Sequence, residues 1–132
     1  MVDGLLALAD ISKGYCKGGK SSIRFVLRDE AGDVRFALGR EIQEVTNNEA
    51  EAITILEALR YCVQHRYTHI LLQTDSMLMK NVIDGTWIAP WAVITYVEEI
   101  KDIMEENNFR ISHIMREGNK LADYLANYAI DV

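Results

Sequence analysis

Two glutamates stand two positions apart in the stretch TNNEAEAITILEAL, residues 46–59. Thr46 is a favoured helix N-cap residue, and Glu49 follows it by three positions, which is the spacing of a capping box. Glu49 therefore has a structural explanation. Glu51 lies about 200° further round the helix, near the face that carries Ile55, so it cannot share that role. It lies at the helix margin with its head in water, or it is held by a partner.

Two aspartates end apolar stretches of the chain: Asp10 ends LLALAD and Asp75 ends ILLQTD. In sheets with helical crossovers, ligands bind at the carboxyl ends of strands. The alternative for Asp75 is a cap on the next helix, a role that Ser76 could also take. Carboxylates that converge on one point repel one another unless a cation neutralises them. A purely oxygen ligand set favours Mg²⁺ or Mn²⁺ over zinc.

The hydrophobic pattern predicts nine elements in the order β-β-β-α-β-α-α-β-α. The expected strands are residues 5–10, 23–28, 34–38, 68–75 and 109–114, with EAGD as the turn of a hairpin. The expected helices are residues 46–65, 76–85, 91–107 and 119–130. A hairpin followed by alternating strands and helices indicates a mixed sheet covered by helices. We expect Trp87 and Trp91 in the core or at a helix start, and Met77 and Met79 in packing.

Length and composition predict a single domain over residues 1–132. The net charge of -6 and a pI near 5.0 do not favour a strongly basic nucleic-acid binder. Residues 13–24 nevertheless hold four basic residues and no acid. Apolar runs are too short for a membrane span, and the start does not resemble a signal peptide. Cys16 and Cys62 read as free thiols of an intracellular protein, nuclear or cytoplasmic.

Three stretches together resemble the type 1 ribonuclease H domain in its plant and retroelement form: TNNEAEAITILEAL, LLQTDSMLMKNVIDG and FRISHIMREGNKLADYLANYA. The resemblance runs from about residue 6 to residue 129 in the family's order. It implies an α/β ribonuclease H-like fold, a five-stranded mixed sheet with an antiparallel hairpin first, then parallel strands, and helices on both faces. It also implies a metal-dependent endoribonuclease that cleaves the RNA strand of RNA/DNA hybrids.

The resemblance assigns roles residue by residue. It implies that two Mg²⁺ (or Mn²⁺) ions are held by four carboxylates: Asp10, Glu51, Asp75 and Asp123. His113, ten residues before Asp123, matches the family's mobile histidine. The expected substrate-binding residues are Ser12, Lys13, Thr46, Asn47, Asn48, Ser76 and, directly after Gly118 in the loop MREGN, Asn119. For Thr46, Asn47 and Asn48, helix capping is the alternative role, and the two roles can coexist.

The first aspartate departs from the family pattern. The family reads Asp-Gly at this point, whereas Asp10 is followed by Ile11. Asp3, which precedes Gly4, is the rival, but Asp10 is preferred because it ends an apolar strand. The alternative function is a catalytically weak or inactive module of the same fold that binds nucleic acid or a protein partner. We expect a monomer, either independent or part of a larger reverse-transcriptase polyprotein.

Overall fold

The computed structural model describes residues 14–16, 20–29, 31–43 and 45–114. Its strands are β1 (Gly14–Cys16), β2 (Lys20–Arg28), β3 (Val34–Ile42), β4 (Leu71–Thr74) and β5 (Arg110–His113). Its helices are α1 (Asn47–Gln64), α2 (Met77–Asp84) and α3 (Ile94–Asn107). The element order from the hairpin to β5 confirms the expected order. The strand expected at residues 5–10 and the helix expected at 119–130 lie outside the described residues.

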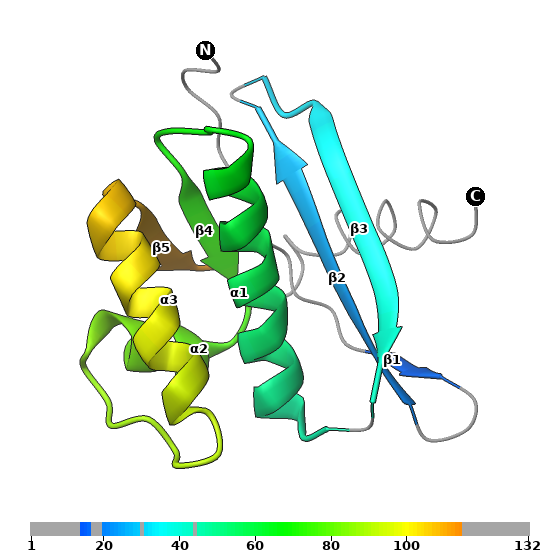
Figure 1. Cartoon of the computed structure of the whole chain (residues 1–132), viewed down its shortest axis with the longest axis vertical. Coiled ribbons are helices and arrows are strands. Elements are labelled where there is room, and N and C mark those ends of the chain that lie inside the picture. The colour runs from blue at the N-terminus through cyan, green and yellow to red at the C-terminus, as the bar shows by residue number, and fades with distance from the viewer. Residues whose placement is uncertain (1–13, 17–19, 30, 44, 115–132) are drawn as a thin grey trace.

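The strands pair in two groups. β1, β2 and β3 form an antiparallel sheet in that order, and β4 pairs with β5 in parallel. No ladder joins the two groups among the described residues. The long β2–β3 hairpin stands beside α1, which packs against both β2 and α3 (Figure 1). α2 packs against α3 and the β4–β5 pair.

The hairpin turn has the residues that a tight turn requires. Gly32 has φ +87°, a left-handed conformation that costs glycine little. The Gly32 N–H donates to the Asp29 carbonyl over 3.0 Å, and the Asp29 carboxylate accepts from the Asp33 N–H, also over 3.0 Å. The predicted turn is therefore confirmed. β2 begins earlier than expected because Lys20–Ser22, which show no apolar alternation, pair with β1.

The core lies between α1, the strands and the inner faces of α2 and α3. Its largest fully buried side chains are Phe25, Leu27, Ile55, Leu59, Ile70, Leu72, Met79, Val82 and Ile100, whereas Val26 is buried separately, against Ala37. Cys62 is buried among them, and this burial raises the pKa of its thiol to about 12. A thiol with that pKa is protonated and unreactive in the folded protein. Met79 is confirmed as a packing residue.

The expected burial of both tryptophans is wrong. Trp87 is 49% exposed and Trp91 is 88% exposed. The expected helix start at residue 91 is also wrong, since residues 91–93 form a turn and α3 begins at Ile94. Val93, Val97 and Ile100 cover the core instead, so the tryptophans stay outside it. Met77 is likewise half exposed, against expectation.

Candidate active site at the carboxyl ends of β4 and β5

Helix α1 separates the roles of its two first-turn glutamates. Thr46 is the N-cap, and its hydroxyl oxygen accepts from the Glu49 N–H over 3.2 Å. The same hydroxyl donates to the Glu49 carboxylate over 3.1 Å. Glu49 is thus engaged at its own helix end, which confirms the predicted capping role in outline. In a complete capping box the carboxylate would accept from the N-cap backbone N–H; here it accepts from the hydroxyl.

Glu51 lies on the other side of α1. Ile55, Ala58 and Cys62 follow it by four, seven and eleven positions, and all three are fully buried. This spacing makes them one stripe, so Glu51 continues the core-facing stripe to the amino end of the helix. Glu51 itself is half-buried. A carboxylate in that position faces the interior edge of the fold rather than the outer surface.

The carboxyl end of β4 carries Asp75. Ser76 is the N-cap of α2, and its hydroxyl accepts from the Met79 N–H over 3.1 Å. The Ser76 N–H in turn donates to the hydroxyl of buried Thr74 over 3.0 Å. Of the two caps that the sequence allowed, Ser76 is the one used. Half-buried Asp75 therefore stands between strand and helix without serving as the cap.

His113 is joined to Asp75 across the two parallel strands. In the β4–β5 register Thr74 pairs with His113, and the Ile114 N–H donates to the Thr74 carbonyl over 3.0 Å. The Nε2 atom of His113 lies 3.2 Å from the Asp75 carbonyl oxygen. A carbonyl oxygen only accepts, so Nε2 carries the proton in this contact. His113 is therefore a strand-end histidine with a satisfied hydrogen bond.

The remaining candidates divide into two groups. Asn48, half-buried, lies in the first turn of α1, and Asn47 is the first residue of that helix. Five candidates lie outside the described residues: Asp10, Ser12, Lys13, Asn119 and Asp123. Within the described ranges, no group of three or more acidic, histidine or cysteine side chains is close enough to hold a metal ion. Only two of the four expected carboxylate ligands, Glu51 and Asp75, fall within those ranges.

β4 runs toward the end of the molecule at which α1 begins (Figure 1). The parallel pairing carries β5 in the same direction. Asp75, His113 and the first turn of α1 are therefore directed to one end of the fold. Carboxylate oxygens of the kind that Asp75 and Glu51 carry are the ligands that a hard cation prefers, and an imidazole such as that of His113 can carry a proton.

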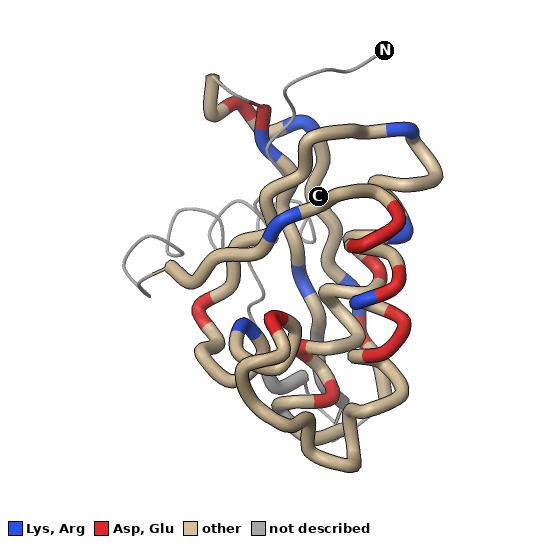
Figure 2. The backbone as a smooth tube through the Cα atoms, turned by 90° about the vertical axis from the view of Figure 1, so that its left-hand side faces the viewer, with Lys and Arg blue, Asp and Glu red and all other residues tan. Residues whose placement is uncertain are grey.

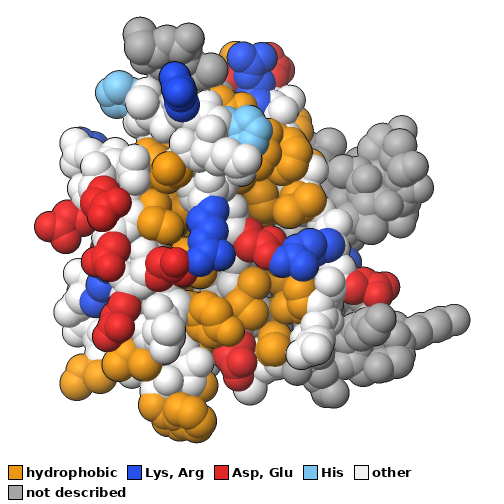
Figure 3. Space-filling view, in the orientation of Figure 1, with side chains coloured by type: hydrophobic (Ala, Val, Ile, Leu, Met, Phe, Trp, Pro, Cys, Tyr) orange, Lys and Arg blue, Asp and Glu red, His pale blue; other side chains and the backbone are white. Residues whose placement is uncertain are grey.

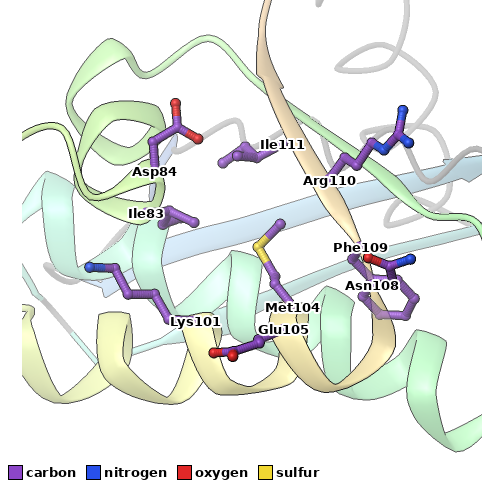
Figure 4. A pocket seen from close by; sticks show the side chains of 9 residues that line it. All are labelled: Ile83, Asp84, Lys101, Met104, Glu105, Asn108, Phe109, Arg110 and Ile111. Carbon is purple, nitrogen blue, oxygen red and sulfur yellow. The ribbon is translucent and has the colours of Figure 1, made fainter.

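A cavity lined by described residues lies elsewhere. It has a volume of about 650 Å³ and is formed by α2, α3 and the amino end of β5. Ile83, Met104 and Ile111 point into it, while Asp84, Lys101 and Glu105 stand at its rim (Figure 4). Asp75 and His113 do not line it. The cavity is thus separate from the candidate active site.

Comparison with known proteins identifies the family of this chain. The reverse transcriptase-like family matches residues 12–129. The chain belongs to that family. It is a ribonuclease H-like domain homologous to the type 1 ribonucleases H. A ribonuclease HI from Halobacterium salinarum is 29% identical over 115 residues, which are 86% of this chain. The chain spans 58% of the length of that relative.

Solved structures confirm the fold. The ribonuclease H1 of Halobacterium salinarum superimposes with a TM-score of 0.80 and 25% identity, over 96% of this chain and 98% of that one. LC11-RNase H1, crystallised with an RNA/DNA hybrid, gives a TM-score of 0.79 and 26% identity, over 96% of both chains. A foamy viral protease-reverse transcriptase matches over 96% of this chain and 20% of its own, with a TM-score of 0.75 at 16% identity. The predicted ribonuclease H-like α/β fold is therefore confirmed.

None of the helices in the described part of the chain combines the length and the apolar character that crossing a membrane requires.

Proposed function

We propose that this domain, over residues 1–132, is a metal-dependent endoribonuclease that hydrolyses the RNA strand of RNA/DNA hybrids. The observation that carries the proposal is which residues cap the two helices at the site. Thr46 and Ser76 cap their helices, so that Glu51 and Asp75 are the carboxylates not used as caps. Homology to ribonucleases H and the hybrid in the LC11-RNase H1 crystal support the substrate class.

The donor set suits Mg²⁺ or Mn²⁺, since carboxylate oxygens are the ligands that hard cations prefer. Glu51 and Asp75 would hold the ions together with Asp10 and Asp123. A pair of such ions supplies charge neutralisation at the phosphate and activation of water. His113 takes up or releases a proton beside Asp75, and its hydrogen bond to the Asp75 carbonyl holds the ring at the strand end. Asn48 lies one helical turn from Glu51 and is proposed to read the minor groove, where the 2′-hydroxyls mark RNA.

The test compares the same substitution at two glutamates two residues apart. Glu51→Gln removes a ligand charge with little change in volume, so hybrid cleavage should fall by about two orders of magnitude or more, the scale of removing one group that acts in the transition state. Hybrid binding and the fold should persist. Glu49→Gln should lower the free energy of unfolding by about 0.5 to 1 kcal/mol and leave cleavage by the folded protein intact. Cleavage of a labelled hybrid, an RNA duplex and a DNA duplex with Mg²⁺ or Mn²⁺ measures this. Equal losses at both glutamates would contradict the assignment.

The second candidate function is a weak or inactive module that binds nucleic acid or a protein. Two observations favour it: Ile11 replaces the glycine that follows the first aspartate in the family, and the net charge is -6. A protein that binds the hybrid in the same assay and cleaves it with neither metal would decide for this alternative.

A further inference from the structure

The connection between α2 and α3, together with the first residue of α3, exposes four large apolar side chains, which we call the apolar patch: Trp87, Ile88, Trp91 and Ile94. Ile88 is 94% exposed and Trp91 is 88% exposed. Apolar side chains gather at the lower end of the molecule in the space-filling view (Figure 3). Large exposed apolar patches on a protein surface mark interaction sites.

The backbone is hydrogen-bonded on both sides of the patch. Gly85 ends α2 in a left-handed conformation, and the N–H groups of Thr86 and Trp87 donate to the Asn81 carbonyl over 2.9 and 3.1 Å. On the other side of the patch, Val93 is fully buried and its N–H donates to the Pro90 carbonyl over 3.0 Å. Hydrogen bonds thus anchor both ends of the connection, which lowers the entropy cost of covering its apolar side chains.

An acidic face continues the patch along α3. Glu98, Asp102 and Glu105 follow Ile94 by four, eight and eleven positions, which places all of them within about 80° of one another on the helix. All four side chains are exposed. Figure 2 shows several acidic positions along this helix with a basic position among them. That position is Lys101, the only basic residue of α3, seven positions after Ile94 and therefore at the edge of the same face. The described residues place no basic side chain within ion-pair distance of these three acids. The surface thus has an apolar end and, from Glu98 to Glu105, a mainly acidic strip roughly 10 Å long.

We propose that the apolar patch and the acidic face of α3 together bind a basic amphipathic protein segment. Such a segment would place bulky apolar side chains on Trp87, Ile88 and Trp91 and its Lys or Arg residues along α3. The acidic charge of the surface favours a basic protein segment over nucleic acid, a lipid surface or a second copy of this chain. The acids repel the phosphates of nucleic acid and anionic lipid headgroups, and a second copy would bring the same acids against each other. The inference does not depend on the proposed nuclease activity.

The two tryptophans of the chain are both in the patch, so their fluorescence reports its burial directly. The probe is a Trp-free helical peptide of about three to five turns with Leu on one face and Lys on the other; a Leu/Glu peptide of the same pattern is the control. The Leu/Lys peptide should bind the full chain and shift the Trp emission to the blue. Binding should weaken several-fold from about 50 to about 300 mM NaCl, because salt screens exposed charges. The Leu/Glu peptide should not bind.

Matched variants locate the binding surface. Ile88→Ser and Trp91→Ser should each weaken peptide binding by about tenfold or more, as for anchor residues of an interface. Val34→Ser and Val63→Ser, which alter exposed apolar residues elsewhere, should leave it unchanged.

A second pair of variants tests the charge. Glu98→Gln/Asp102→Asn should weaken binding and reduce its salt dependence, whereas Asp33→Asn/Glu41→Gln, which removes the same charge from the hairpin, should not. Circular dichroism checks that each variant is folded. The proposal is overturned if the peptide binds without a change in Trp emission, or if patch and control variants behave alike. It is also overturned if the patch variants weaken hybrid binding or abolish a concentration-dependent dimer instead.

Discussion

Substitutions of Ser76 can distinguish its structural role as a helix cap from a role in binding the substrate. Its hydroxyl accepts from the Met79 N–H over 3.1 Å, and its own N–H donates to Thr74. Ser76→Ala removes the cap and leaves the first-turn N–H groups of α2 with one acceptor fewer. The expected loss is about 1 kcal/mol of the free energy of unfolding. For a domain of this length that corresponds to a fall of about 3 to 5 °C in the melting temperature.

The companion variants test the reasoning. Ser76→Gly should lose only a few tenths of a kcal/mol, and Ser76→Asp should retain the cap because aspartate is an equally good N-cap residue. Ser76→Asp nevertheless places a second carboxylate beside Asp75, so it should weaken hybrid binding by repelling the phosphate. Thermal unfolding followed by circular dichroism, with hybrid binding measured at fixed salt, checks all three. A melting temperature unchanged in Ser76→Ala, or lowered equally in Ser76→Asp, would refute the capping argument.

Three further predictions concern pH, metal and turnover. Burial raises the pKa of the Cys62 thiol to about 12 in the folded protein, against 9.0 for an unperturbed thiol. The stabilisation from burying the neutral thiol is therefore complete below pH 9 and is lost as the pH rises toward 12, because the unfolded chain ionises first. Urea unfolding at pH 8 and pH 10 should therefore show a steeper alkaline loss for the parent than for Cys62→Ala; parallel losses would contradict the burial argument. Millimolar Mg²⁺ should raise the melting temperature of the parent. Asp75→Asn should raise the stability of the metal-free protein and weaken this response to Mg²⁺. A melting temperature that does not change at tens of millimolar Mg²⁺ would count against a metal site. His113→Ala should slow hybrid cleavage without abolishing it, because water partly replaces a proton carrier; single-turnover rates measure the loss, and abolished cleavage would contradict this role.

Local sequence signals predicted the parts of the fold that depend on near neighbours. The turn at Gly32, the cap at Thr46 and the end of α2 at Gly85 each rest on one residue with a strong conformational preference, and all are confirmed. The expected strand 68–75 was too long because His69 adopts a left-handed conformation with φ +58°, which the apolar pattern does not register. Periodicity reports which residues are apolar, and not where the chain leaves the sheet.

In the candidate site too, local sequence predicts some features and the tertiary structure determines the others. Helix geometry alone distinguished Glu49 from Glu51, since both belong to one helix with a known start. The choice between Asp75 and Ser76 as a cap required the backbone at the strand end. The hydrogen bond from His113 to the Asp75 carbonyl joins residues 38 positions apart in the chain, and it depends on the register between β4 and β5. No local pattern contains that register.

Hydrophobicity alone does not predict the apolar patch, because a large apolar residue is expected to be buried. The available signal was the position of Trp87 and Trp91 on either side of Pro90, between two helices that already had complete apolar faces. Apolar residues in excess of what a core can accommodate are candidates for an interface.

The parallel register of β4 and β5 has a consequence for how this domain can diversify. Thr74 and His113 are held as a pair by the sheet, and the chain between them travels through α2, the exposed connection and α3 before it returns. Because the strand pairing sets where His113 returns, the connection can lengthen, shorten or change its side chains without displacing the histidine. A slip of a single residue, by contrast, would turn the His113 side chain to the opposite face of the sheet. The fold therefore lets the outer connection change its sequence and acquire new partners. At the strand ends, by contrast, the position of His113 is either kept or lost completely.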